Sequence, residues 1–317
     1  MADIGLIDVD GKGFPNLALM KISAYHKSLG DRVEWRDNDM VFHDRVYMSK
    51  IFSDAYTKDI PDPVNCGEVV RGGTGYCISL VDGKEVFDKS RNTSLPDAVE
   101  RMRPDYSIYP DCDFAVSMTS RGCPRGCAFC HVAAKEGRCS KKVADVEQYW
   151  QGQKKIEVMD ANITACPDKR DLFSQYIETG ARINFNQGLD IRLINDDDIY
   201  DINRMKIDKL HFAWDNPEDN LEGKFRQFAG QTTKNFAHGY KGMVYCLTNF
   251  ADVSEEQHKE DALERVYLLR SLGFDPYIMI YNKPNAPRVL RLMQRWCNNK
   301  FVFNTCEKFE DYDEKQA

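Results

Sequence analysis

The feature that most constrains the fold is an alternation of short apolar runs and helical stretches along the last two thirds of the chain. Each apolar run has the length of a buried parallel strand, and the segment after it favours a helix. The runs cover residues 114–118, 156–159, 183–185, 210–214, 243–247 and 277–281. Six such units are too few for a closed eight-stranded barrel. The pattern therefore predicts an α/β fold whose parallel sheet forms a partial (β/α)6 barrel.

The N-terminal residues predict a smaller layer of the same kind. A strand-like run at 4–10 precedes apolar residues at helical spacing up to Gly30, and further strand-like runs follow at 33–35 and 45–52. Strand, helix and strand in this order favour a parallel sheet with crossover connections. We therefore expect a Rossmann-like α/β domain ahead of the partial barrel.

Composition shifts divide the chain into four expected segments. They are a Rossmann-like domain at 1–82, a polar linker at 83–112, the partial barrel at 113–306 and an acidic tail at 307–317. We expect this tail to fray because it is short and strongly charged. Within the barrel, Ser254 and Gln257 form a capping-box pattern that predicts a helix ending near Gly273.

Composition and charge exclude several classes of protein. No apolar run approaches the roughly 18 residues that cross a bilayer, and the first residues do not resemble a secretory signal, so we expect a cytoplasmic protein. The net charge of −7 gives no electrostatic case for binding a polyanion over the whole surface. Residues 121–155 are locally basic, which leaves both an anion-binding role and a solvated basic surface open.

Cysteine usage separates three residues from the rest. Eleven cysteines with irregular spacing make a poor disulfide framework, and a reducing cytosol keeps thiols free. Eight occur singly, as small buried hydrophobes do. Cys123, Cys127 and Cys130 instead form a C-x3-C-x2-C set directly after the first strand of the larger domain. Thiolates are the ligands that zinc and iron–sulfur clusters select, and three thiolates leave one iron of a 4Fe–4S cluster without a protein ligand.

This spacing, on the loop after a first barrel strand, resembles the signature of the radical S-adenosylmethionine (radical SAM) superfamily. The resemblance covers residues 113–306 and implies a radical SAM barrel in which S-adenosylmethionine chelates the open iron. It further implies that an electron from the cluster breaks a sulfonium C–S bond, and that the resulting 5′-deoxyadenosyl radical abstracts a hydrogen atom from substrate. Phe129 matches the aromatic position that packs near the adenine in that family. An external electron donor of the flavodoxin or ferredoxin type is implied as well.

The resemblance also suggests which strand ends contact S-adenosylmethionine. The family uses a Gly-Gly-Glu run after the second strand to contact the amino group, and this chain has Asp160 and Asn162 there instead. Both residues are also typical of a turn or a helix cap.

The family often takes a Gln, an Arg and an Asp from successive strand ends, which makes Gln187, Arg192 and Asp215 candidates. An arginine suits a carboxylate because its planar donors match that group. Alternatives stay open for these residues too, since Arg192 has the spacing of a surface ion pair with Asp190 and Asp215 that of a turn.

Two functions from different classes follow. One is a radical SAM enzyme acting on a nucleotide or nucleic-acid base, for which the local basic stretch and the N-terminal domain argue. The other is a non-catalytic zinc- or iron–sulfur-binding interaction protein, in which His131 completes a Cys3His set. Cobalamin is not expected, because the Asp-x-His-x-x-Gly pattern is absent, and the sequence indicates neither the substrate nor the oligomeric state.

Overall fold

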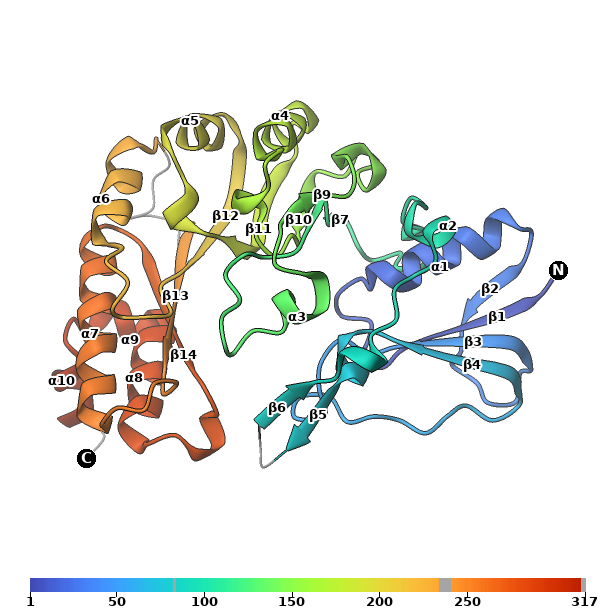
Figure 1. Cartoon of the computed structure of the whole chain (residues 1–317), viewed down its shortest axis with the longest axis horizontal. Coiled ribbons are helices and arrows are strands. Elements are labelled where there is room, and N and C mark those ends of the chain that lie inside the picture. The colour runs from blue at the N-terminus through green and yellow to red at the C-terminus, as the bar shows by residue number, and fades with distance from the viewer. Residues whose placement is uncertain (82–83, 234–240, 315–317) are drawn as a thin grey trace. The chain divides into compact units, whose positions relative to one another are not determined.

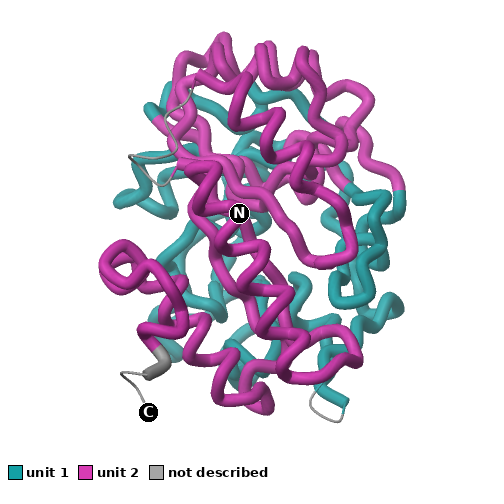
Figure 2. Tube along the Cα trace, turned by 90° about the vertical axis from the view of Figure 1, so that its left-hand side faces the viewer, with its two compact units in different colours: residues 1–118, 122–138, 143–154 teal, residues 119–121, 139–142, 155–317 magenta. Residues whose placement is uncertain are grey.

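The structure is a computed structural model that describes residues 1–81, 84–233 and 241–314. The chain forms two compact units, coloured separately in Figure 2. The first unit comprises residues 1–118, 122–138 and 143–154, and the second comprises 119–121, 139–142 and the chain from 155 onward. Each unit is built around a parallel sheet, as the sequence predicts (Figure 1).

The first unit contains a four-stranded parallel sheet with the order β2-β1-β3-β4. This is the order of the first four strands in flavodoxin-type doubly wound sheets. The elements are β1 (Asp3–Asp8), α1 (Leu17–Ser28), β2 (Arg32–Trp35), β3 (His43–Ser49) and β4 (Cys66–Gly72). Helix α1 begins where the Asn16 side chain accepts a hydrogen bond from the Leu19 amide, and it ends before Gly30, whose φ is 84°. The expectation of a parallel N-terminal layer is confirmed.

Of the linker expected at 83–112, the described residues 84–112 do not form a linker but belong to the first unit. Their elements are β6 (Lys84–Phe87), η2 (Lys89–Arg91), α2 (Asp97–Glu100) and η3 (Tyr106–Ile108), and β6 pairs antiparallel with β5 (Ile78–Val81). Val99, Ile108 and Tyr109 are buried in one cluster with Ile4 and Leu6 of β1. A few irregularly spaced apolar side chains show no sequence period, yet each one that reaches the core adds favourable burial. The predicted linker is therefore wrong for the described residues 84–112, which are part of the first unit.

The larger sheet has the strand order β14-β13-β12-β11-β10-β7, which is the chain order throughout. Its strands are β7 (Ala115–Ser117), β10 (Lys155–Val158), β11 (Arg182–Leu189), β12 (Lys206–Ala213), β13 (Gly242–Thr248) and β14 (Asp275–Ile280). Pairing from β10 to β14 is parallel. Every strand expected from the sequence is present.

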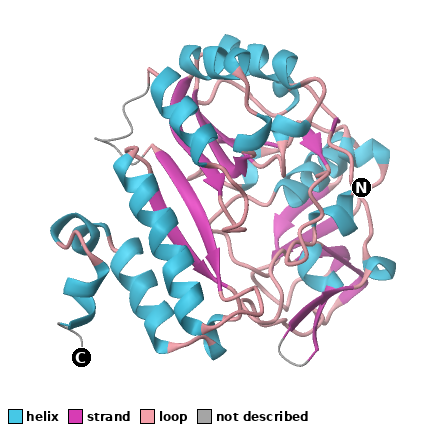
Figure 3. Cartoon of the chain, turned by 60° about the vertical axis from the view of Figure 1, so that its left-hand side comes forward, coloured by secondary structure: helices cyan, strands magenta, loops and turns pink. Residues whose placement is uncertain are grey.

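Helices of the second unit pack on one face of this sheet (Figure 3). They are α4 (Lys169–Thr179), α5 (Asp196–Arg204), α6 (Glu222–Gln231), α7 (Glu255–Ser271), α8 (Arg288–Asn298), α9 (Lys300–Thr305) and α10 (Phe309–Glu314). Phe173 of α4 contacts Phe185 of β11, and Phe212 of β12 contacts Phe225 and Phe228 of α6. None of the helices in the described ranges has the length and apolarity that crossing a bilayer requires.

The C-terminal helices differ from the expected frayed tail. Phe309 and Tyr312 of α10 are buried in a cluster around Trp296 of α8, so the tail is anchored as far as Tyr312, and residues 315–317 of the expected tail lie outside the described residues. The expected start of α7 is confirmed, because the Ser254 hydroxyl accepts a hydrogen bond from the Gln257 amide. The Gln257 side chain binds Asp261 and does not complete the expected capping box.

Candidate functional site

The three motif cysteines lie on one loop whose two ends are tied together. The Cys123 amide donates to the Gly137 carbonyl at 3.1 Å, and the Gly122 amide donates to the Glu136 carboxylate at the same distance. Both partners lie at the end of the short helix α3 (Val132–Glu136). The chain from 122 to 137 therefore forms a closed loop, and the Cys130 amide adds a turn by donating to the Cys127 carbonyl at 3.0 Å.

Two glycines give this loop its shape. Gly122 and Gly126 have φ values of 90° and 56°, which strain any residue with a side chain. A β-carbon on Gly126 would lie 2.9 Å from the guanidinium carbon of Arg138, so that cation packs against the loop backbone. A positive charge at this point offsets the negative charge that the thiols acquire when they lose their protons to bind a metal.

The cysteines are thiols and are accessible. Cys123 and Cys127 are half-buried and Cys130 is exposed, while Phe129 between them is half-buried. Among the described residues, no three His, Cys, Asp or Glu side chains are grouped closely enough to hold a metal ion. The structure thus places the three thiols on one closed loop without gathering their sulfur atoms. The donor chemistry of this loop fits a soft metal cluster, and its glycines give the backbone freedom to converge.

His131 has partners other than the cysteines. Its ring stacks on Phe87 with centroids 5.9 Å apart, and its Nε2 lies 3.5 Å from the Glu85 carboxylate. Both partners belong to β6, which lies in the first unit with the loop. This position argues against His131 as the fourth ligand of a Cys3His zinc set.

Asp160 is buried and holds the segment just before the cysteine loop by hydrogen bonds. Its side chain accepts hydrogen bonds from the Thr119 amide at 3.0 Å, from the Thr119 hydroxyl at 2.8 Å and from the Ser120 amide. Burial raises the pKa of Asp160 to about 6, although these donors act in the opposite direction. Its carboxylate is thus occupied by the segment that leads into the cysteine loop, which favours the turn interpretation over contact with a ligand.

Asn162 is a cap. It is buried at the start of the 3₁₀ turn η5 (Ile163–Ala165), where its Oδ1 accepts from the Thr164 hydroxyl at 2.8 Å and the Ala165 amide at 3.2 Å. The alternative reading of Asn162 as a cap is therefore the one observed.

Arg192 and Asp190 form the ion pair that the spacing allowed. The Arg192 Nε lies 2.6 Å from Asp190, and its Nη1 lies 2.6 Å from Asp219, a partner that the sequence does not reveal. Arg192 Nη2 makes no hydrogen bond among the residues that the structure describes. Asp190 and Asp219 thus fix the Arg192 guanidinium, while its Nη2 stays available.

Asp215 follows β12, and its backbone carbonyl accepts a hydrogen bond from the buried Arg265 of α7.

Gln187 lies on an irregular part of β11. Phe185 and Leu189 are four residues apart, whereas their partners Leu210 and Phe212 on β12 are two apart. The intervening residues bulge out, and Gly188 has a φ of 97°. Gln187 is exposed at this bulge, next to the Met159 sulfur at 3.9 Å. Such bulges often lie beside functional sites because they redirect side chains.

Sequence reasoning missed a buried polar row on the sheet face opposite the described helices of the second unit. Glu157 of β10 and Asn184 of β11 are register partners, and His211 lies on β12 two residues beyond Lys209, the partner of Asn184. Each of the three polar residues is less than 10% exposed. The signal was available, because each is a single polar residue between two apolar ones on a buried strand.

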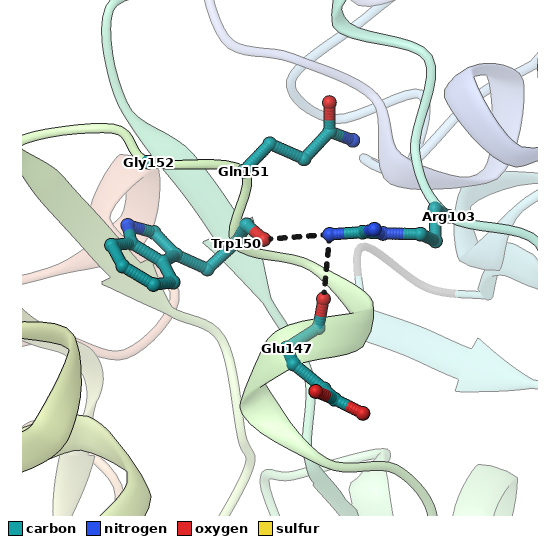
Figure 4. A pocket seen from close by; sticks show the side chains of 5 residues that line it. All are labelled: Arg103, Glu147, Trp150, Gln151 and Gly152. Carbon is teal, nitrogen blue, oxygen red and sulfur yellow. Dashed lines mark hydrogen bonds between the residues drawn. The ribbon is translucent and has the colours of Figure 1, made fainter.

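A pocket in the first unit contains none of the candidate residues. Arg103, Glu147, Trp150, Gln151 and Gly152 line it. In Figure 4, the Arg103 guanidinium lies between the Glu147 and Trp150 carbonyls, to which it donates at 3.1 and 3.0 Å. The Arg103 guanidinium is thus committed to the backbone.

Comparisons with known proteins find no family model and no curated protein that matches the chain.

Proposed function

We propose that this chain is a radical SAM enzyme in which Cys123, Cys127 and Cys130 bind a 4Fe–4S cluster. One observation carries the proposal: the C-x3-C-x2-C set lies on a single closed loop, which follows the first strand of a sequentially ordered parallel sheet. Sequential order with helices on one face supports a partial barrel, because a doubly wound sheet reverses its order and carries helices on both faces.

The loop residues have distinct proposed roles. The three thiolates bind iron, Gly122 and Gly126 let them converge, and Arg138 offsets the accumulated charge. When bound, a cluster with one open iron supplies the electron that cleaves S-adenosylmethionine to a 5′-deoxyadenosyl radical, which abstracts hydrogen from substrate. Phe129 packs near the adenine in this proposal.

The strand ends supply the remaining contacts. Arg192, held by Asp190 and Asp219, directs its free Nη2 at the S-adenosylmethionine carboxylate. Gln187 and Asp215 contribute polar groups from neighbouring strand ends, whereas Asp160 and Asn162 act as positioning residues that shape the turn beside them. The proposed substrate is a nucleotide or nucleic-acid base, and the electron comes from a flavodoxin- or ferredoxin-type donor in the cytoplasm.

The test is anaerobic purification followed by incubation with dithionite and S-adenosylmethionine. We expect a brown protein with several irons per chain that releases 5′-deoxyadenosine. Cys127→Ala reduces this product to the level without enzyme, whereas Cys139→Ala retains it, because Cys139 is exposed and outside the motif. Equal amounts of 5′-deoxyadenosine from both variants would refute the proposal.

The non-catalytic zinc protein predicts a different result from the same purification. It gives a colourless chain with one zinc and no 5′-deoxyadenosine. A Cys3His site also requires His131 to leave Phe87 and Glu85, so His131→Ala would release the zinc. A protein whose metal is iron and is unaffected by His131→Ala excludes this alternative.

A further inference from the structure

The polar row of Glu157, Asn184 and His211 is unusual for a sheet interior. Ile156 and Val158 flank the first of these residues, and their side chains are almost fully buried on the opposite side of the strand. The same alternation repeats on β11 and β12, so the three polar side chains share the face opposite the described helices of the second unit. Buried polar groups normally have hydrogen-bond partners, and each exception requires an explanation.

Asn184 is one such exception. Its Nδ2 donates to Glu157 at 2.6 Å, and Glu157 also pairs with Lys155 at 2.8 Å. This bond fixes the orientation of the amide, so Asn184 Oδ1 is the atom left over. Although it is buried, Asn184 Oδ1 has no hydrogen-bond partner within the described chain. An unpaired buried acceptor costs about 1–3 kcal/mol, which a ligand that donates a hydrogen bond would recover.

His211 presents a second acceptor. Its Nδ1 lies 2.9 Å from the Phe185 carbonyl, which only accepts, so Nδ1 carries the proton. Burial lowers the pKa of His211, and the ring is therefore neutral near pH 7. The Nε2 lone pair is then an acceptor, and it makes no hydrogen bond in the part of the chain that the structure describes.

Aromatic rings continue this row along the sheet. The His211 ring stacks on Tyr245 with centroids 5.7 Å apart, and Tyr245 meets Tyr277 edge to face at the same separation. Both tyrosines are half-buried, so their rings are partly accessible. The two acceptors disfavour phosphate and carboxylate oxygens, which also only accept, while accessible aromatic surface favours a planar ligand.

We propose that Asn184 Oδ1 and His211 Nε2 form a two-acceptor subsite that binds the amino group of an amino-substituted heteroaromatic ring, such as a nucleobase. Glu157 is a positioning residue that orients the Asn184 amide, and Tyr245 and Tyr277 provide apolar surface for the ring. That this ligand is the substrate rests on the proposed function, but its binding does not.

The binding experiment compares cytidine with uridine on the full chain, by calorimetry. The two nucleosides differ at C4, where cytidine has an amino group and uridine a carbonyl, and at N3, which accepts a hydrogen bond in cytidine and donates one in uridine. Cytidine is chosen over adenosine because S-adenosylmethionine itself contains adenine. We expect cytidine to bind at least about tenfold more tightly, since its amino group donates two hydrogen bonds, whereas uridine has one N–H donor between two carbonyl acceptors. Equal affinities, or no cytidine binding, would overturn the subsite.

Two variants separate binding from folding. His211→Asn keeps a donor for the Phe185 carbonyl but removes the Nε2 acceptor, and Asn184→Leu removes Oδ1 at similar volume. Each should weaken cytidine by about tenfold, whereas Asn203→Ala on α5 should leave its affinity unchanged. In the native chain, cytidine should also shift the His211 Nε2 resonance in nitrogen-15 NMR, which a purely structural histidine would not show.

The outcomes also separate this subsite from the proposed function. Cys127→Ala should abolish 5′-deoxyadenosine and leave cytidine affinity intact. Conversely, His211→Asn that binds cytidine as tightly as the native chain would refute the subsite even if the cluster chemistry is correct.

Discussion

Two carboxylates at strand ends, one in each unit, have the same raised pKa and different surroundings. Asp8 ends β1 and Asp160 follows β10, and burial raises the pKa of each to about 6. Asp160 receives three hydrogen bonds from Thr119 and Ser120. Asp8 is half-buried and accepts from the Tyr109 hydroxyl at 2.9 Å. A similar pKa therefore does not identify a similar role.

The role of each acid follows from the segment it holds. Asp160 fixes the residues just before the cysteine loop, so it supports the candidate site indirectly. The Tyr109 hydroxyl that binds Asp8 also accepts from the Asn16 amide at 3.1 Å, and Asn16 caps α1. Asp8 thus stabilises the start of a helix, and neither acid needs a catalytic function to explain its pKa.

The largest change in stability should come from removing the Asp160 carboxylate. Asp160→Ala leaves the Thr119 and Ser120 amides buried without their acceptor, which should lower the free energy of unfolding by about 3 kcal/mol. Denaturant unfolding measures this change. Asp168→Ala is the matched control, because Asp168 is exposed and its side chain caps nothing, so a change below about 0.5 kcal/mol is expected. Similar losses of unfolding free energy in both variants would show that the Asp160 hydrogen bonds do not stabilise the fold.

The next largest effect should be the change in folding stability with pH. A folded pKa of about 6, against an ordinary 3.8, means that the folded chain keeps a proton at pH 5 that the unfolded chain has lost. Stability from these two acids is therefore present below pH 4 and lost as the pH rises to about 6, by at most about 3 kcal/mol for the fully buried Asp160.

Asp8→Asn tests the share of Asp8 in this loss. An asparagine still accepts from Tyr109 but does not titrate, so the fall in unfolding free energy between pH 4 and 6 should be smaller in the variant. The share of Asp8 should also be smaller than that of Asp160, because Asp8 is more accessible to solvent. An unchanged pH profile would mean that Asp8 titrates normally.

The smallest effect should come from the tyrosine bridge. Tyr109→Phe removes one hydroxyl that links Asp8 to the start of α1, at an expected cost of about 1 kcal/mol. Tyr200→Phe, at an exposed tyrosine, should change the thermal midpoint within error. If the two variants unfold at the same temperature, the bridge contributes nothing measurable.

Local sequence predicts the elements of this fold but not its long-range contacts. Strands such as 183–185 and the Ser254 cap carry their signal within a few residues, so both were predicted correctly. Asp160 and Thr119 are 41 residues apart, and no local pattern reveals that they meet. Phe309 was missed because surrounding charges dilute the apolar signal, although its burial against Trp296 anchors the C-terminal helix.

The candidate site shows the same division. The cysteine spacing is a local pattern and was readable, whereas the ligand-contact predictions depended on how strand ends meet. Asn162 caps a turn, and Arg192 is shared with Asp219, 27 residues away. His211 and Asn184 were overlooked because a single polar residue in a strand is ordinary, and only the structure shows that both are buried on the same face of neighbouring strands.

The bulge in β11 has a consequence for how this sheet can vary. Between Phe185 and Leu189 the strand contains two more residues than its partner, an even number that keeps both side chains on the helix-covered face. Asn186 and Gln187 can thus be exchanged, or the extra pair deleted, without inverting the inside-outside alternation downstream. The bulge residues can therefore vary while the rest of the sheet keeps its register.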